Sequence, residues 1–458
     1  MTIRERIETF WGNKVVRSVG VLVGGTAFAH GITALSLPIV TRLYTPADFS
    51  VLAVFASLLS ILSVAACLRF DLAIPIPEQD AEAMNLLALA LGGTVIVAAM
   101  VAAAELGLSR SVANAFRQPA LARWLWMLPI GILLAGAYSA LQSWFVRRKA
   151  FGSIAQSRVT QSAAAASVQV GMGWIHWTPV GLIVGQLLNT GAGCANLGYR
   201  FLRHERSLLG AITWSGMRAG YSKYDRFPKY STFEALSNVA GMQLPIIIIA
   251  AQAAGPEAGF LMLAMSAMQA PMSLIGNAIA QVYLSRAPDE LRAGRLDAFT
   301  SHMFGGLVKT GTGPLVCAGI LAPTLFSLVF GAEWHRAGVL VTWMTPWFIM
   351  QYLSVPISMA LHVTGSQRVA LALQILGLIL RVGMVYAASV FARSLISEAF
   401  ALSGFAFYAI YLVTVLRIVD AKMDAVVRET RRSLPAVVLW TAASGCLLAL
   451  SSLLHSVQ

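Results

Sequence analysis

Long apolar runs recur along the whole chain and are separated by short polar segments. Each run approaches the length of about 20 residues with which a helix crosses the hydrocarbon of a bilayer. Thirteen runs begin near Ser18, Phe49, Ala83, Ala122, Ile154, Pro179, Ser231, Gly259, Phe304, Val339, Ala370, Ile396 and Leu434. The pattern therefore predicts an all-α, polytopic membrane protein with about 12 to 14 transmembrane helices.

The chain divides between its sixth and seventh runs, at the longest predicted cytoplasmic connection. Leu37-Pro38 at the predicted end of the first span matches Leu244-Pro245 at the predicted end of the seventh, and Pro46 matches Pro256. An even number of spans in each half gives two parallel repeats, so we expect two six-helix bundles around a central cavity. The expected domains are a first bundle over residues 1–199, a basic cytoplasmic linker over 200–230, a second bundle over 231–417, and a basic segment with an extra helix over 418–458.

The charge distribution fixes the expected orientation. Only 12% of residues are charged, against about 25% in soluble proteins, while 57% are hydrophobic. With the N-terminus in the cytoplasm, 25 of the 33 Lys and Arg residues fall in inside segments and 6 in outside ones. Basic residues concentrate on the cytoplasmic side of membrane proteins. The net charge of +13 thus marks topology and contact with membrane lipids, with no nucleic acid as partner.

Two cations fall within predicted spans. Arg381 stands near the middle of the run from Ala370 to Phe391, and Lys309 lies about 8 Å inside the ninth run. An arginine at a helix centre costs roughly 2.5–3.5 kcal/mol, so it usually faces a wet cavity or an anionic partner. The chain is therefore expected to bind or move an anion. The alternatives are an internal tether for Arg381 and a Lys309 side chain that snorkels to the cytoplasmic surface.

Four further charged residues lie at predicted span ends, and each has two interpretations. Arg69 and Asp71, in CLRFDLAIPIP after the second span, form either a cytoplasmic gate or a salt-bridged helix end. Arg42, at the outer end of the first span, is either a release site or an interfacial anchor. Glu234, which opens the seventh span, is either a proton-coupling carboxylate or one that favours the helix N-terminus.

Several stretches in both halves carry a family resemblance. They are residues 18–91, which include TRLYTPADF; SKYDRFPKYSTFEALSNVAGMQLPIII over 222–248; AMSAMQAPMSLIGNAIAQVYLSRAPDE over 264–290; and LFSLVFGAEWHRAGVL over 325–340. The chain resembles polysaccharide-biosynthesis flippases, the Wzx-type members of the multidrug/oligosaccharidyl-lipid/polysaccharide exporter superfamily.

The resemblance implies a specific transport reaction. Such a flippase moves an undecaprenyl-diphosphate-linked O-antigen or other polysaccharide repeat unit from the cytoplasmic to the periplasmic leaflet of the bacterial inner membrane. The polysaccharide polymerase machinery is a further candidate partner. The diphosphate would then be bound by Arg381, Lys309, Arg69 and Arg42, with Asp71 and Glu234 as gating or coupling groups. A planar guanidinium grips phosphate oxygens in a bidentate way, which favours Arg381.

Other functional classes fit the sequence less well. The chain has no HExxH, CxxC or P-loop motif, so we expect no metal, no cofactor and no ATPase activity. A membrane glycosyltransferase or O-antigen polymerase would need a large outside loop with reactive groups, and the longest outside segment here is only Gly107 to Leu121. A multidrug or cation exporter would favour carboxylates inside its spans. A peptidoglycan-precursor flippase of the same superfamily remains an alternative.

Overall fold

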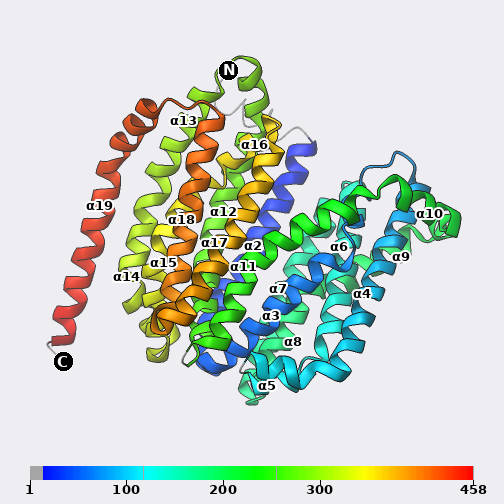
Figure 1. The fold of residues 1–458 in the computed structure, drawn as a ribbon, viewed down its shortest axis with the longest axis horizontal. Coiled ribbons are helices and arrows are strands. Elements are labelled where there is room, and N and C mark those ends of the chain that lie inside the picture. Colours follow the sequence, from blue (N-terminus) through cyan, green and yellow to red (C-terminus); the bar gives the residue numbers. More distant parts are fainter. Residues whose placement is uncertain (1–13, 117, 254, 457–458) are drawn as a thin grey trace. The chain divides into compact units, whose positions relative to one another are not determined.

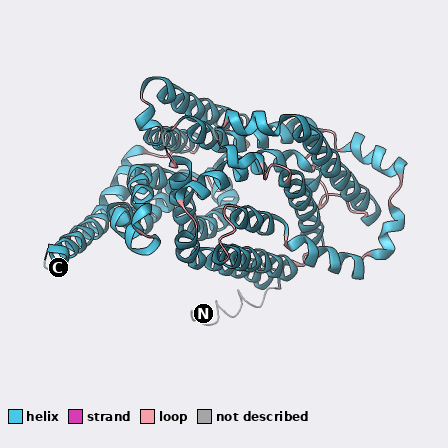
Figure 2. Cartoon of the chain, turned by 90° about the horizontal axis from the view of Figure 1, so that it is seen from below, coloured by secondary structure: helices cyan, strands magenta, loops and turns pink. Residues whose placement is uncertain are grey.

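The computed structural model describes residues 14–116, 118–253 and 255–456, and this part of the chain contains helices and no strand. Figures 1 and 2 show helices joined by short loops. The chain divides into two compact units between Gln243 and Leu244. The predicted all-α membrane architecture is therefore confirmed. The N-terminal stretch that was predicted to be cytoplasmic lies, up to residue 13, outside the described residues.

The first unit is built from nine helices among the described residues, followed by a tenth that runs across the division. They are α2 (Lys14–Leu43), α3 (Pro46–Ala66), α4 (Asp80–Ala115), α5 (Pro119–Ala122), α6 (Met127–Arg147), α7 (Phe151–Trp174), α8 (Val180–Gly191), α9 (Gly193–His204), α10 (Trp214–Lys223) and α11 (Thr232–Gln252). Helices α2 and α7 pack together, and a Cβ atom at Gly25 would lie only 2.6 Å from the Cβ of Ala155. Glycine at this position thus permits close contact between the two helices.

The second unit contains eight described helices. They are α12 (Glu257–Arg292), α13 (Leu296–Leu307), α14 (Gly313–Phe330), α15 (His335–Ser354), α16 (Ala360–Val363), α17 (Gln367–Phe391), α18 (Ile396–Ile418) and α19 (Met423–Ser456). Helix α15 packs against α12, α14 and α18, α17 packs against α16 and α18, and α19 packs against α13 and α14. Short helical turns occupy Phe70–Leu72, Arg206–Ala211, Phe227–Ser231, Val308–Thr312, Ala332–Trp334, Ile357–Met359 and Arg393–Leu395.

Eight helical segments within the described residues are long and apolar enough to cross a membrane. They are Gly20–Leu43, Pro46–Ala66, Asp80–Gly107, Met127–Arg147, Phe227–Gln252, Leu296–Phe330, Arg368–Phe391 and Arg393–Ile418. The other five predicted runs are also helical, and two of them depart from an uninterrupted apolar helix. Helix α7 carries Gln156, Ser157 and Arg158, and the run from Pro179 divides into α8 and α9 of 12 residues each.

The proline pairs that suggested a repeat occupy matching places in the structure. Pro38 lies inside α2 and Pro245 inside α11, whereas Pro46 begins α3 and Pro256 directly precedes α12. The prediction that Pro38 and Pro245 end their spans was wrong, because both helices continue beyond them. Proline is tolerated inside membrane helices because neighbouring groups satisfy the freed backbone carbonyls.

The predicted linker, residues 200–230, is largely helical. It contains the end of α9 and all of α10, and α10 packs against α4. Asn85 of α4 strengthens this contact, because its side chain accepts a hydrogen bond from the Thr213 backbone nitrogen at 3.0 Å and donates one to the Ala211 carbonyl at 3.0 Å. The linker residues around α10 therefore pack as part of the first unit.

Candidate functional site

Arg381 lies deep within α17. It is the fifteenth of the 25 residues that run from Gln367 to Phe391, so it stands close to the middle of a helix that can span the membrane. Only 2% of the residue is exposed. The structure thus buries a guanidinium at the depth where a charge is most costly.

Aromatic side chains of α18 cover the guanidinium. Its central carbon lies 4.2 Å from the ring centroid of Phe407 and 5.5 Å from that of Tyr408. Gly377, one helical turn before Arg381, makes this approach possible, because a Cβ there would lie 2.7 Å from the Phe407 ring. The Tyr408 carbonyl also accepts a hydrogen bond of 3.2 Å from Ser354 at the end of α15. Helices α15, α17 and α18 together fix the position of the Arg381 side chain.

Arg381 has no anionic partner in the described part of the chain. It forms no ion pair there and its Nε is buried without a hydrogen-bond partner, while the neutral side chain of Tyr408 accepts a hydrogen bond from the guanidinium. A desolvated cation–π contact contributes about 2 kcal/mol, which is less than the roughly 2.5–3.5 kcal/mol that an arginine costs at a helix centre. The guanidinium therefore retains the capacity to bind an anion, and its planar donors match phosphate or carboxylate oxygens.

The structure places Lys309 apart from Arg381 in the fold. Lys309 is exposed in the turn Val308–Thr312 between α13 and α14. That turn packs against α13, α14, α15 and α19, whereas α17 packs against α16 and α18. Arg42, in the last turn of α2, and Glu234, in the first turn of α11, are both exposed and belong to the first unit.

Arg69 and Asp71 occupy a tight turn after α3, but they do not form an ion pair. Arg69 has a left-handed backbone with φ of 61°, and its Nε is buried without a partner. Asp71 is 6% exposed and accepts a 2.6 Å hydrogen bond from Ser139 of α6, while its other carboxylate oxygen has no partner. The salt-bridged interpretation of this pair was therefore wrong, because Asp71 turns toward α6.

Two arginines that the sequence analysis counted only as topology signals organise the end of α6. Arg147 donates to the carbonyls of Pro77 and Glu78 and pairs with Asp80 at 2.8 Å. Arg148 pairs with Asp80 at 3.0 Å and with Glu205 at 2.7 Å, and its hydrogen bond to Glu205 raises the pKa of the Arg148 guanidinium. These contacts hold the segment before α4 and the end of α9 against α6.

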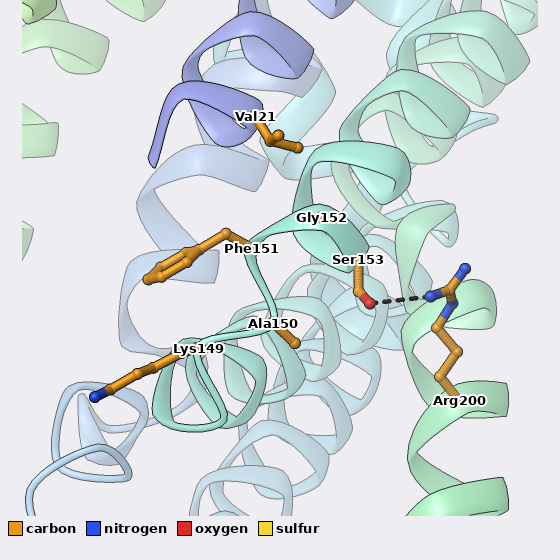
Figure 3. Close-up of a pocket in the computed structure, with 7 residues that line it drawn as sticks. All are labelled: Val21, Lys149, Ala150, Phe151, Gly152, Ser153 and Arg200. Atoms are coloured by element: carbon orange, nitrogen blue, oxygen red, sulfur yellow. Dashed lines mark hydrogen bonds between the residues drawn. The ribbon is translucent and has the colours of Figure 1, made fainter. Parts of the chain in front are cut away.

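A cavity of about 390 Å³ lies beside this cluster, between α2, the turn from α6 to α7, and α9. Its two cations are Lys149 and Arg200, and Arg200 donates a 3.0 Å hydrogen bond to Ser153. Figure 3 shows that the Arg200 guanidinium reaches from α9 toward Ser153, whereas the Lys149 side chain points away from Ser153. The two side chains are therefore not arranged to grip one phosphate together.

Comparisons with known proteins agree on one fold. Residues 39–338 match the profile of a family described as polysaccharide biosynthesis protein. No curated protein matches the chain. Among solved structures, the lipid II flippase MurJ in an inward closed conformation is similar with a TM-score of 0.70 and 11% identity, over 92% of this chain and 92% of that chain.

Two further solved structures share this architecture. An inward-facing multidrug resistance MATE family transporter of the MOP superfamily has a TM-score of 0.59 and 13% identity, over 89% of this chain and 98% of its own. A MOP superfamily transporter from Pyrococcus furiosus has a TM-score of 0.51 and 14% identity, over 89% and 96%. The identities are low, so these likenesses establish the fold. With the family match over most of its length, the chain belongs to the polysaccharide biosynthesis protein family and is a multi-pass membrane protein with the MOP transporter fold.

Proposed function

We propose that the protein is a flippase for a lipid-linked oligosaccharide. Its substrate would be an undecaprenyl-diphosphate-linked O-antigen or other polysaccharide repeat unit, moved by alternating access from the cytoplasmic to the periplasmic leaflet of the inner membrane. Membership of the polysaccharide biosynthesis family supports a saccharide substrate, and the transporter fold supports movement across the membrane. The observation that carries the proposal is the buried Arg381, which has no anionic partner in the described chain.

The geometry around Arg381 suits a phosphate group. The guanidinium carbon lies 4.2 Å above the Phe407 ring centroid, and this contact restricts the movement of the side chain. An arginine held in this way can form two parallel hydrogen bonds to phosphate oxygens. In the proposed mechanism, Arg381 binds the diphosphate while the lipid tail remains in hydrocarbon. Lys309, Arg69 and Arg42 would contact the headgroup at other stages of transport, and Asp71 or Glu234 would act as a gating or coupling carboxylate.

Two related functions compete with this one. A multidrug exporter would bind organic cations, which an unpaired Arg381 in the middle of a span repels. A peptidoglycan-precursor flippase would also move a lipid-linked diphosphate, and Arg381 does not discriminate against it. A membrane glycosyltransferase would have to bring reactive groups to a large outside loop, and the sequence offers none. Arg381 is thus the argument for a diphosphate group in the substrate, and the family match is the argument for a saccharide.

Purified protein in lipid vesicles would test the proposal. Three substrates are offered from one leaflet: an undecaprenyl-diphosphate oligosaccharide, a lipid-linked peptidoglycan precursor, and an organic cation. Exposure of each substrate in the other leaflet is then measured against protein-free vesicles. We expect acceleration for the oligosaccharide alone. If only the peptidoglycan precursor or only the cation is accelerated, the oligosaccharide is not the substrate and the accelerated compound is.

A further inference from the structure

A charged cluster joins three helices at one end of the second unit. Arg336 in the first turn of α15 pairs with Glu257 in the first turn of α12 at 2.9 Å, and with Glu398 in the first turn of α18 at 2.6 Å. The Arg336 side chain is 30% exposed, whereas those of Glu257 and Glu398 are 17% and 10% exposed. The cluster thus contains two carboxylates and one guanidinium, which leaves one negative charge in excess.

The two carboxylates differ in the number of their oxygens that have a hydrogen-bond partner. In Glu257, Oε1 pairs with Arg336 and Oε2 accepts a 2.9 Å hydrogen bond from Ser397. In Glu398, Oε1 pairs with Arg336, but Oε2 is buried and has no hydrogen-bond partner. Glu398 as a whole is 8% exposed. A buried carboxylate oxygen without a donor is costly, so a positively charged donor that reaches this oxygen would form a strong hydrogen bond.

Glu398 lines a cavity whose other walls are apolar. The cavity has a volume of about 540 Å³ and lies between α15, α17 and α18, where Trp343, Pro346, Leu402 and Phe405 are among its lining residues. Phe405 follows Glu398 by seven residues, which is about 10 Å along α18. Because Glu398 lies at the end of a span, the cavity has its acceptor at the membrane boundary and its apolar walls toward the hydrocarbon.

The rim of the cavity is also apolar. Trp343 and Leu402 are 55% and 56% exposed, and Leu395 is 54% exposed. A water-soluble ligand would have to leave water to cross such a rim, whereas a lipid is already in contact with apolar surface. The arrangement of one acceptor at the boundary and apolar walls beneath it matches an amphiphile that carries a cationic donor on its headgroup.

We propose that this cavity binds a bilayer lipid whose headgroup ends in a primary ammonium, such as phosphatidylethanolamine. The ammonium donates a hydrogen bond to Glu398 Oε2, while an acyl chain lies against Trp343 and Phe405. A primary ammonium has three N–H donors, and its bond to a carboxylate is charge-assisted. The proposal is independent of which lipid-linked substrate the protein moves.

Lipid binding to the purified full-length protein would test this site. The protein in detergent micelles is titrated with phosphatidylethanolamine, phosphatidylcholine or phosphatidylglycerol of identical acyl chains, and bound lipid is counted by native mass spectrometry. Phosphatidylcholine keeps the positive charge but lacks N–H donors, and phosphatidylglycerol has no ammonium. Because a charge-assisted hydrogen bond contributes about 1.5 kcal/mol or more, we expect phosphatidylethanolamine to bind about tenfold more tightly than phosphatidylcholine.

Three variants separate the cavity from the charged cluster. Wild-type protein should prefer phosphatidylethanolamine to phosphatidylcholine about tenfold, because one charge-assisted hydrogen bond is gained. Glu398→Gln should reduce this preference to about twofold or less. Glu257→Gln removes the same charge from the same arginine without altering the cavity lining and should retain the preference. Ala388→Phe, which fills the cavity from α17, should lower the affinity for all three lipids and provides the test if Glu398→Gln does not fold. Equal affinities in the wild-type protein, or an equal loss in Glu257→Gln, would overturn the proposal.

Discussion

Replacement of Arg381 by methionine should not destabilise the protein. Met has a similar length and flexibility but no charge, so Arg381→Met removes the unpaired guanidinium while it still fills the space against Phe407. The alternative role of Arg381, as an internal tether between α17 and α18, predicts a loss of about 1 kcal/mol or more. The free energy of unfolding therefore distinguishes an anion-binding role of Arg381 from a role in stabilising the fold.

The expected magnitude follows from the contacts of Arg381. An arginine at a helix centre costs roughly 2.5–3.5 kcal/mol, and the stack on Phe407 at 4.2 Å offsets about 2 kcal/mol of this cost. No ion pair among the described residues offsets the remainder. The hydrogen bond with Tyr408 offsets about 0.5–1.5 kcal/mol, so we expect Arg381→Met to change the free energy of unfolding by less than about 1 kcal/mol in the absence of substrate.

Equilibrium unfolding in mixed micelles of dodecyl maltoside and SDS measures this change. Arg368→Met is the matched control, because Arg368 lies on the same helix but is exposed at its beginning. The control should change the free energy by no more than about 0.5 kcal/mol. A loss of 1 kcal/mol or more in Arg381→Met would refute the reasoning and identify Arg381 as a structural tether.

Three further predictions concern packing, the α6 cluster and topology. Gly377→Ala places a Cβ 2.7 Å from the Phe407 ring and should cost about 1–3 kcal/mol of unfolding free energy, whereas Gly383→Ala on the same helix meets no atom within 4 Å and should not destabilise. Arg147→Lys should cost about 1–3 kcal/mol in the same assay, because lysine cannot reproduce the fork of donors toward Pro77, Glu78 and Asp80, while the exposed Arg203→Lys should be neutral. A reporter fused at Arg226 should give a cytoplasmic signal, and a periplasmic signal there would contradict the whole orientation.

The sequence predicted the membrane fold because its main signal is hydropathy. The apolar runs are long, and lipid requires every backbone polar group in them to bond within a helix. Proline positions such as Pro46 and Pro256 also marked the starts of matching helices in the two units. The sequence did not predict that α2 and α11 continue past Pro38 and Pro245, because a proline within an apolar run can either end a membrane helix or be accommodated inside it.

The candidate site could be predicted only in part. A lone arginine within an apolar run identified Arg381 without any structure, since the cost of its charge is a property of the run itself. Its stack on Phe407 depends on a partner helix and on Gly377, which no local pattern connects. The cluster of Arg336, Glu257 and Glu398 likewise joins residues from three helix ends that are far apart in sequence. In the sequence, each of these residues resembles the charged residues that commonly lie at the ends of membrane spans.

Transport by Arg381 variants in vesicles measures whether the buried arginine binds the diphosphate during flipping. The protein is reconstituted with an undecaprenyl-diphosphate oligosaccharide, and the rate at which the saccharide appears in the opposite leaflet is compared for wild type, Arg381→Lys and Arg381→Ala. The account predicts that Arg381→Ala abolishes the acceleration although the protein folds and inserts. It also predicts that Arg381→Lys restores only part of it, because a lysine cannot bind phosphate in a bidentate way. A wild-type rate in Arg381→Ala would contradict the account.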